Sequence, residues 1–140
     1  MNRKKILIVD DELYITQILA YKLKQAGALV VTANDGEEGF KMASEHQPDL
    51  ILTDFQMPGL NGLEMAVRLK EEPKTHQIPL LMLTARGHKL SPSQLARTNI
   101  KGLLPKPFSA REVIAKAAEL IGAPQEDDEP PATNGDSAAA

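Results

Sequence analysis

The sequence contains no cysteine among its 140 residues, which excludes disulfide frameworks, thiolate metal sites and thiol catalysis. No apolar run approaches the roughly 18 residues that a membrane-spanning helix needs. The first residues, MNRKK followed by a short apolar run and then acidic residues, lack the pattern of a secretory signal. The length fits one domain. These features predict a soluble, cytoplasmic protein without a membrane partner.

Basic residues are not in excess, because 16 Lys and Arg stand against 19 Asp and Glu and the formal net charge is −3. This balance argues against an indiscriminate nucleic-acid binder, which is usually strongly basic. The charge is also unevenly placed. Residues 123–140 contain Glu126, Asp127, Asp128, Glu129 and Asp136 but no Lys or Arg. The C-terminal segment therefore carries −5, and the preceding 122 residues carry +2.

The acidic C-terminal segment is poor in residues that could build a core. It contains three prolines and no uncharged side chain larger than that of Gln. Such a composition buries too little apolar surface to offset the entropy lost on ordering. Pro124 also prevents a preceding helix from continuing. We therefore predict a folded domain over residues 1–122 and a disordered, acidic tail rich in Pro and Ala over residues 123–140.

Short apolar runs alternate with helical patterns along the rest of the chain. The runs cover residues 5–9, 28–33, 49–53, 79–83 and 100–104, and their hydrophobicity is typical of strands covered on both faces. The first helical pattern places Ile15, Ile18, Leu19, Leu23 and Ala26 on one face, and the third places Leu63, Ala66 and Val67 inward. Capping patterns mark helix starts at Asp35, Ser91 and Ser109. Five βα units predict an α/β fold with a doubly wound, five-stranded parallel sheet.

Polar side chains follow these runs at the ends where ligands bind in open parallel sheets. Asp10 and Asp11 follow the first run, Asp54 the third, Thr84 the fourth and Lys106 the fifth. A single Asp at a strand–helix junction is most often a helix N-cap, so the functional interpretation depends on the whole set. Three converging carboxylates repel one another, and a hard divalent cation with oxygen ligands, Mg²⁺ first of all, relieves the repulsion.

The same set is suited to phosphoryl chemistry. Three aspartates, one Mg²⁺ and Lys106 sum to zero formal charge, so the cluster can accept an anion at little electrostatic cost. A carboxylate in such a cluster can attack phosphorus, while the metal and the lysine neutralise the phosphoryl group. The Thr84 hydroxyl is placed to donate to a phosphoryl oxygen.

Four segments in register resemble the response-regulator receiver domain, the CheY-like family of two-component signal transduction. They are ILIVDDE (6–12), DLILTDFQMPGLNGLE (49–64), LLMLTA (80–85) and LPKPF (104–108), and the likeness covers residues 5–122. The resemblance implies a flavodoxin-like sheet with the strand order 2-1-3-4-5. It implies a signalling module whose only chemistry is its own phosphorylation and dephosphorylation.

The resemblance also implies roles for individual residues. Asp54 would be phosphorylated by a sensor histidine kinase or a histidine phosphotransfer protein. Asp11, Asp54 and the backbone carbonyl of Gln56 would ligate Mg²⁺, with Asp10 acting mostly through water. Lys106 would contact the phosphoryl group, and the Lys106–Pro107 bond would be cis, which is cheap only before proline.

The sequence departs from the family pattern at Leu103, where the family usually has Tyr or Phe coupled to the threonine. We therefore expect the signal to pass through the Thr84 loop and residues 87–99. Gln56 and Arg86 occupy positions that flank the phosphoryl group in the family and tune its lifetime. With no output domain expected in residues 123–140, the output would be a downstream protein that contacts the fourth helix, fifth strand and fifth helix, without direct binding to nucleic acid.

Three alternatives remain open at the level of sequence. The first is a Mg²⁺-dependent phosphohydrolase with an aspartyl-phosphate intermediate, against which Gln56 occupies the place of a second Asp. The second is a flavin or nucleotide binder, although neither GxGxxG nor GxxxxGK[ST] occurs. The third is that the chain is the receiver fragment of a longer regulator, with the acidic tail as its linker.

Overall fold

The computed structural model describes residues 2–85 and 89–121. The strands are β1 (Lys5–Val9), β2 (Leu29–Ala33), β3 (Leu50–Asp54), β4 (Leu80–Thr84) and β5 (Ile100–Pro105). The helices are α1 (Leu13–Gln25), α2 (Gly36–His46), α3 (Gly62–Glu71), α4 (Pro92–Ala96) and α5 (Ala110–Leu120). All strand pairs are parallel and the sheet order is β2-β1-β3-β4-β5, which confirms the predicted fold class.

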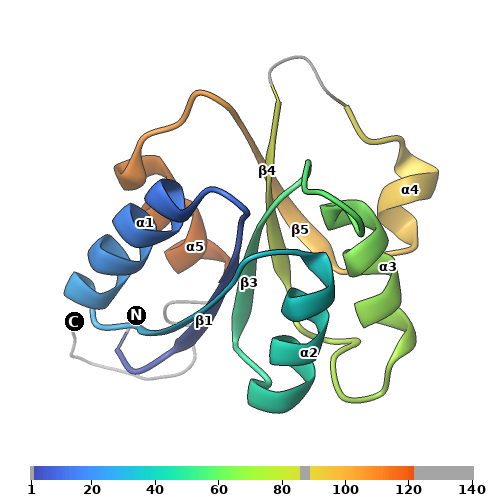
Figure 1. The fold of residues 1–140 in the computed structure, drawn as a ribbon, viewed down its shortest axis with the longest axis horizontal. Helices are drawn as coiled ribbons and strands as arrows, with labels where there is room; N and C mark the ends of the chain where they lie inside the picture. Colours follow the sequence, from blue (N-terminus) through green and yellow to red (C-terminus); the bar gives the residue numbers. More distant parts are fainter. Residues whose placement is uncertain (1, 86–88, 122–140) are drawn as a thin grey trace, which may run out of the picture.

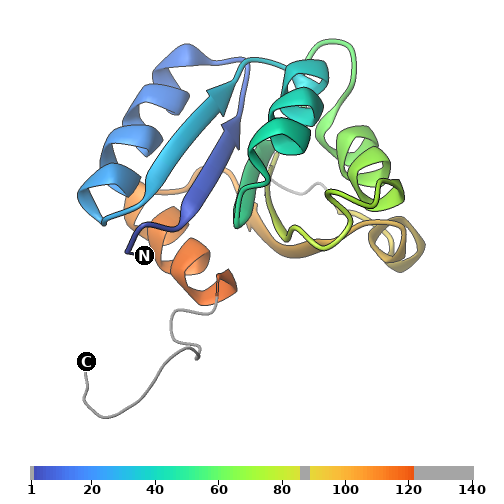
Figure 2. The same ribbon diagram turned by 90° about the horizontal axis from the view of Figure 1, so that it is seen from below.

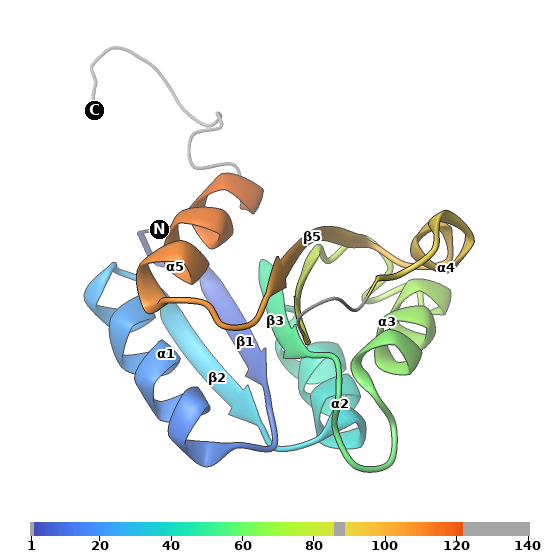
Figure 3. The same ribbon diagram turned by 90° about the horizontal axis from the view of Figure 1, so that it is seen from above.

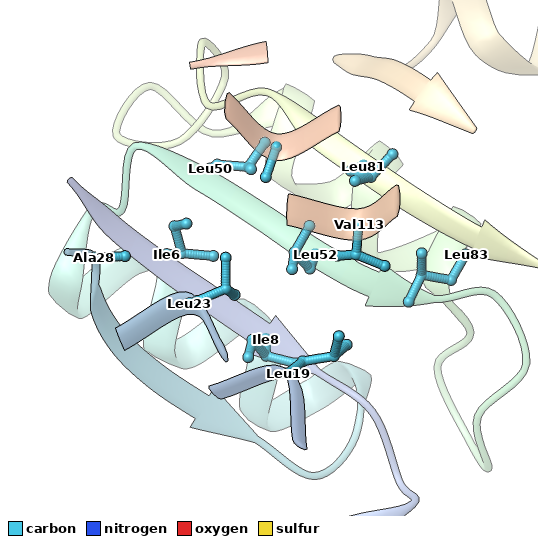
Figure 4. Packing of buried hydrophobic residues seen from close by; sticks show 11 residues of the cluster. Ile6, Ile8, Leu19, Leu23, Ala28, Leu50, Leu52, Leu81, Leu83 and Val113 are labelled. Carbon is cyan, nitrogen blue, oxygen red and sulfur yellow. The ribbon is translucent and has the colours of Figure 1, made fainter. Parts of the chain in front are cut away.

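Helices cover both faces of this sheet, and each face holds its own apolar cluster (Figures 1 and 2). Side chains alternate between the faces of a strand, so Ile6 and Ile8 pack under α1 and α5 while Leu7 and Val9 pack under α2 and α3. Figure 4 shows the first cluster, in which Val113 of α5 lies over the central strands. Burial on both faces explains why the inner strands β1, β3 and β4 are unbroken apolar runs.

Three strands, β3, β4 and β5, end one residue later than their sequences predict. Asp54 is the last residue of β3 and aligns with Leu83, while Thr84 is the last residue of β4 and aligns with Pro105. Backbone pairing with the neighbouring strands continues past the apolar run, which is why hydrophobicity alone places the ends too early. Both of these candidate site residues therefore start from the sheet rather than from a loop.

The buried faces of two helices differ from prediction. On α1, Ile18 and Ala26 are exposed, and the small polar Thr16 is buried instead. On α3, Met65 and Leu69 join Ala66 in the core, while Leu63 and Val67 are only half-buried. An apolar stripe gives the side of a helix that can be buried, but the neighbouring elements decide how much of that side they cover.

The predicted helix starts are present, with one difference. Ser91 with Gln94 and Ser109 with Glu112 form complete capping boxes. At α2 the Asp35 side chain accepts from Glu38 N–H, but the Glu38 carboxylate accepts from Asn34 N–H at 2.7 Å. In the part of the chain that the structure describes, no helix is long and apolar enough to span a lipid bilayer. The predicted tail (residues 123–140), the domain end near Gly122, and Arg86 lie outside the described residues.

Candidate functional site

The carboxyl ends of the strands bring distant acidic residues together. Asp10 and Asp11 directly follow β1, and Asp54 ends β3, the neighbour of β1 in the sheet. In Figure 3 the arrowheads of β1 and β3 point toward the same edge. One carboxylate oxygen from each of the three residues lies within 4.8 Å of the other two. The predicted acidic cluster is therefore present.

The three carboxylates differ sharply in their surroundings. Asp10 and Asp54 are 1% and 5% exposed, whereas Asp11 is exposed. Asp10 Oδ1 accepts the backbone N–H of Glu12 at 2.8 Å, which is the local turn-forming role that a lone Asp at a helix start usually has. Its second oxygen, Oδ2, is buried and has no hydrogen-bond partner among the described residues. A buried acceptor without a partner is costly, so a ligand at this position would be favoured.

Burial dominates the ionisation of Asp10. It raises the pKa of this carboxyl from the ordinary value of 3.8 to about 6. The hydrogen bond from Glu12 N–H opposes the shift, the charge of Asp54 adds to it, and the charge of Lys106 opposes it. The Asp10 carboxylate is therefore held in an environment that disfavours its own negative charge.

Lys106 reaches the cluster from the segment that follows β5. Its Nζ lies 3.0 Å from Asp54 Oδ1, in an ion pair with one buried partner. Partial burial alone would lower the pKa of Lys106, but the hydrogen bond to Asp54 and the charges of Asp54 and Asp10 outweigh it and raise that pKa. Lys106 N–H also donates to the Thr84 carbonyl at 2.7 Å, which places the two residues side by side. The Lys106–Pro107 bond is cis, as the resemblance implies.

The cluster fits a hard divalent cation. Oxygen-only donors of negative charge are what Mg²⁺ prefers, and the partnerless buried oxygen of Asp10 is a donor without another use. Asp10, Asp11 and Asp54 are the residues that would hold the ion. Gln56 lies two residues beyond Asp54 in the β3–α3 loop with its side chain exposed.

Gly62, at the start of α3, allows the chain to approach the backbone of Asp54 and Phe55 closely. Gly62 N–H donates to the Phe55 carbonyl at 2.8 Å. A Cβ at Gly62 would collide with the Asp54 carbonyl oxygen and lie 3.1 Å from Phe55 Cα. The sequence predicts that Gly62 is a turn former, a role compatible with shaping the loop beyond Asp54. The close approach to the Asp54 backbone is visible only in the structure, because it involves backbone from another segment.

The chain matches the family model described as "Response regulator receiver domain" over residues 6–118. It belongs to the response-regulator receiver domain family. Two transcriptional regulators resemble this receiver domain. The phosphate regulon protein PhoB of Pseudomonas aeruginosa is 37% identical over 86% of this chain and 53% of its own length. The alkaline phosphatase synthesis regulator PhoP of Bacillus subtilis is 39% identical over 84% of this chain and 48% of its own length.

The receiver domain thus spans about half the length of the curated relatives it matches. A solved structure, of a putative response regulator from Chloroflexus aurantiacus, superposes with a TM-score of 0.78 at 29% identity and covers 86% of this chain and 99% of that one. Receiver domains are signalling modules of two-component systems rather than classical enzymes, and the family binds Mg²⁺ at an acidic site. Family membership therefore favours a signalling module over the phosphohydrolase and nucleotide-binding alternatives.

Proposed function

We propose that Asp54 of this receiver domain accepts a phosphoryl group from a histidine kinase or a histidine phosphotransfer protein. The observation that carries the proposal is the Asp54 carboxylate, which ends a central strand beside two other carboxylates and 3.0 Å from the Lys106 ammonium. The sheet thus fixes the position of the nucleophilic Asp54 oxygen. The Lys106 ammonium lies beside it and can neutralise charge on the phosphoryl group that Asp54 accepts.

In the proposed transfer, an Asp54 oxygen forms a bond to phosphorus as the phosphorus–nitrogen bond of the donor's phosphohistidine breaks. The imidazole leaves with the bonding electron pair and takes up a proton from solvent. Asp11, Asp54, the Gln56 carbonyl and, mostly through water, Asp10 would hold Mg²⁺, which would supply charge neutralisation for the phosphoryl oxygens. Lys106 holds a second positive charge beside the same oxygens.

A small phosphodonor tests this proposal. Incubating the protein with acetyl phosphate and Mg²⁺ should add about 80 Da to the intact mass, the mass of one phosphoryl group. Asp54→Asn should abolish the adduct, because the amide is not a nucleophile, and chelation of Mg²⁺ should strongly suppress it. Rapid release of phosphate from many monoesters over multiple turnovers would instead support the hydrolase.

Phosphorylation of Asp54 would alter the face built from α4, β5 and α5 and so control a downstream protein. Lys106 and Thr84 share a backbone hydrogen bond, so a phosphoryl group that engages either side chain pulls on β4 and β5 together. The α4 helix has five residues, none of them buried, so little packing opposes its rearrangement. Leu103, 38% exposed on β5, adds apolar surface to this face.

The output proposal is tested by amide chemical shifts with and without beryllofluoride, a phosphoryl mimic. We expect changes across residues 84–104. If the shifts in this range are unchanged while those around Asp54 move, the output does not use this face.

The start of α1 is the natural contact for a protein donor. Leu13 and Tyr14 follow Asp10 and Asp11 after a single residue, Glu12, and Tyr14 is 71% exposed. A protein that delivers a phosphoryl group to Asp54 must cover this edge, and exposed aromatic residues provide much of the binding energy of interfaces.

Tyr14→Ala should therefore slow transfer from a histidine phosphotransfer protein by about tenfold or more. The rate with acetyl phosphate should be unchanged, because Tyr14 lies outside the acidic cluster. Tyr21→Ala, two helical turns further from the site, is the matched control and should have a smaller effect. Equal losses with both donors would instead indicate damage to the acidic site.

A further inference from the structure

An open groove of about 370 Å³ lies between α1 and α5. Lys22 of α1 lines it together with Ala110, Arg111, Ile114 and Ala115 of α5. Figures 1 and 3 show these two helices side by side on one face of the sheet. None of the lining residues belongs to the acidic site. Three are apolar, two are cationic and none is acidic.

Lys22 and Arg111, the two cations of the groove, are available to pair with an anionic segment. Neither Lys22 nor Arg111 forms an ion pair within residues 2–85 and 89–121, and both are exposed. The neighbouring carboxylate of Glu112 already accepts the Ser109 N–H in the α5 capping box. The groove therefore suits a segment that combines negative charge with small apolar side chains.

We propose that the acidic run Glu126–Glu129 of the same chain docks in this groove. The run is preceded by Pro124, which offers a compact apolar ring to the alanine and isoleucine side chains of α5. Residues 123–140 carry −5, against +2 for the rest of the chain, so the attraction has the required sign. The proposal concerns a contact within the chain and does not depend on the proposed phosphorylation.

The length of chain between α5 and the acidic run matches the distance it must cover. From Arg111 to Ile121 the helix advances about 15 Å at 1.5 Å per residue. Five extended residues, 122–126, span about 16 Å. A chain that turns back after Ile121 therefore brings Glu126 level with Arg111. Gly122 permits such a reversal and Pro124 prevents further helix.

Tethering makes even a weak contact effective, because a short linker raises the local concentration of the acidic run to the millimolar range. The docked run would lie beside Lys22, one helical turn from the exposed Ile18 of α1. It would then limit access to α1 by a phosphodonor protein. That regulatory consequence, unlike the contact itself, rests on the proposed function.

The contact can be measured without any phosphorylation. Because the chain has no cysteine, Ala132→Cys allows a single nitroxide label on the full-length protein. We expect the amide signals of Lys22 and residues 110–115 to lose most of their intensity through paramagnetic relaxation. The loss should disappear on reduction of the nitroxide, and at about 0.5 M NaCl, where the Debye length is roughly 4 Å.

Two variants of the labelled chain decide the outcome. Neutralising the run with Glu126→Gln, Asp127→Asn, Asp128→Asn and Glu129→Gln together should restore the signals, and so should Arg111→Glu. As a control, Glu71→Gln with Glu72→Gln at the C-terminal end of α3 should leave the relaxation unchanged. Unaltered signals at Lys22 and 110–115 in the labelled parent would overturn the proposal. So would relaxation centred instead on Lys70 and Lys101, which line a separate open pocket with Leu120 of α5. Loss of the mass adduct on Asp54 would leave it untouched.

Discussion

Replacing Asp10 with Asn should stabilise the metal-free protein by about 2 kcal/mol at pH 7. The Asp10 carboxylate is 1% exposed, and its pKa is raised from 3.8 to about 6, chiefly by burial. A shift of this size corresponds to about 3 kcal/mol of destabilisation when the group is ionised. The amide keeps the acceptor for Glu12 N–H but buries an unpaired NH₂ group, which costs about 1 kcal/mol.

The gain should depend on pH with a definite sign. Because the folded state has the higher pKa, it binds more protons than the unfolded state between about pH 4 and 6. The destabilisation caused by ionised Asp10 is therefore absent below pH 4. It grows as the pH rises through this window and is complete above it. Urea unfolding in EDTA at pH 4 and pH 7 measures the difference directly.

At saturating Mg²⁺ the wild-type protein should be more stable to unfolding than Asp10→Asn, the reverse of the order expected without metal. The ion stabilises whichever folded state binds it, and Asp10→Asn removes one of the three clustered charges. Asp11→Asn is the matched control: Asp11 is exposed, so the substitution should weaken Mg²⁺ binding with little effect on metal-free stability. If Asp10→Asn destabilises the metal-free protein at pH 7, burial of the charge is not the dominant influence at this position.

Gly62→Ala should destabilise the fold by about 2–3 kcal/mol and weaken Mg²⁺ binding. The new methyl group would collide with the Asp54 carbonyl oxygen and crowd Phe55 Cα, so backbone must move. Since that backbone carries the proposed phosphoacceptor, the geometry of the acidic cluster should change with it. Urea unfolding gives the stability, and a Mg²⁺ titration of the folded variant gives the loss of affinity.

Gly59→Ala is the control for Gly62→Ala in the same loop. It tests the effect of an unfavourable backbone conformation without the close backbone contact that Gly62 makes. Gly59 has φ +73°, and a Cβ there meets nothing within 4 Å. Its substitution should cost only about 1 kcal/mol, from the left-handed conformation, and should leave the Asp54 backbone in place. Equal Mg²⁺ affinities for the two variants would show that contact with Asp54 is not what Gly62 provides.

Much of this molecule can be predicted from its sequence because local patterns and global fold agree. The inner strands β1, β3 and β4 are apolar runs since both their faces are buried, and the starts at Ser91 and Ser109 have capping boxes. The sequence does not predict which side chains of a helix are buried where that depends on how much of the helix the neighbouring elements cover. Ile18 lies on the predicted face of α1 but is 37% exposed. On α3, Met65 and Leu69 are buried, while the predicted Leu63 and Val67 are only half-buried.

The candidate site divides in the same way. The residue types that follow each strand can be predicted from the sequence, and the parallel order of the strands predicts that Asp10, Asp54 and Lys106 meet at one edge. The burial of Asp10, with one oxygen lacking a partner among the described residues, and the exposure of adjacent Asp11 follow from the packing of the folded chain. Burial and close backbone approach, as at Gly62, depend on segments distant in sequence, so they are properties of packing and not of any local pattern.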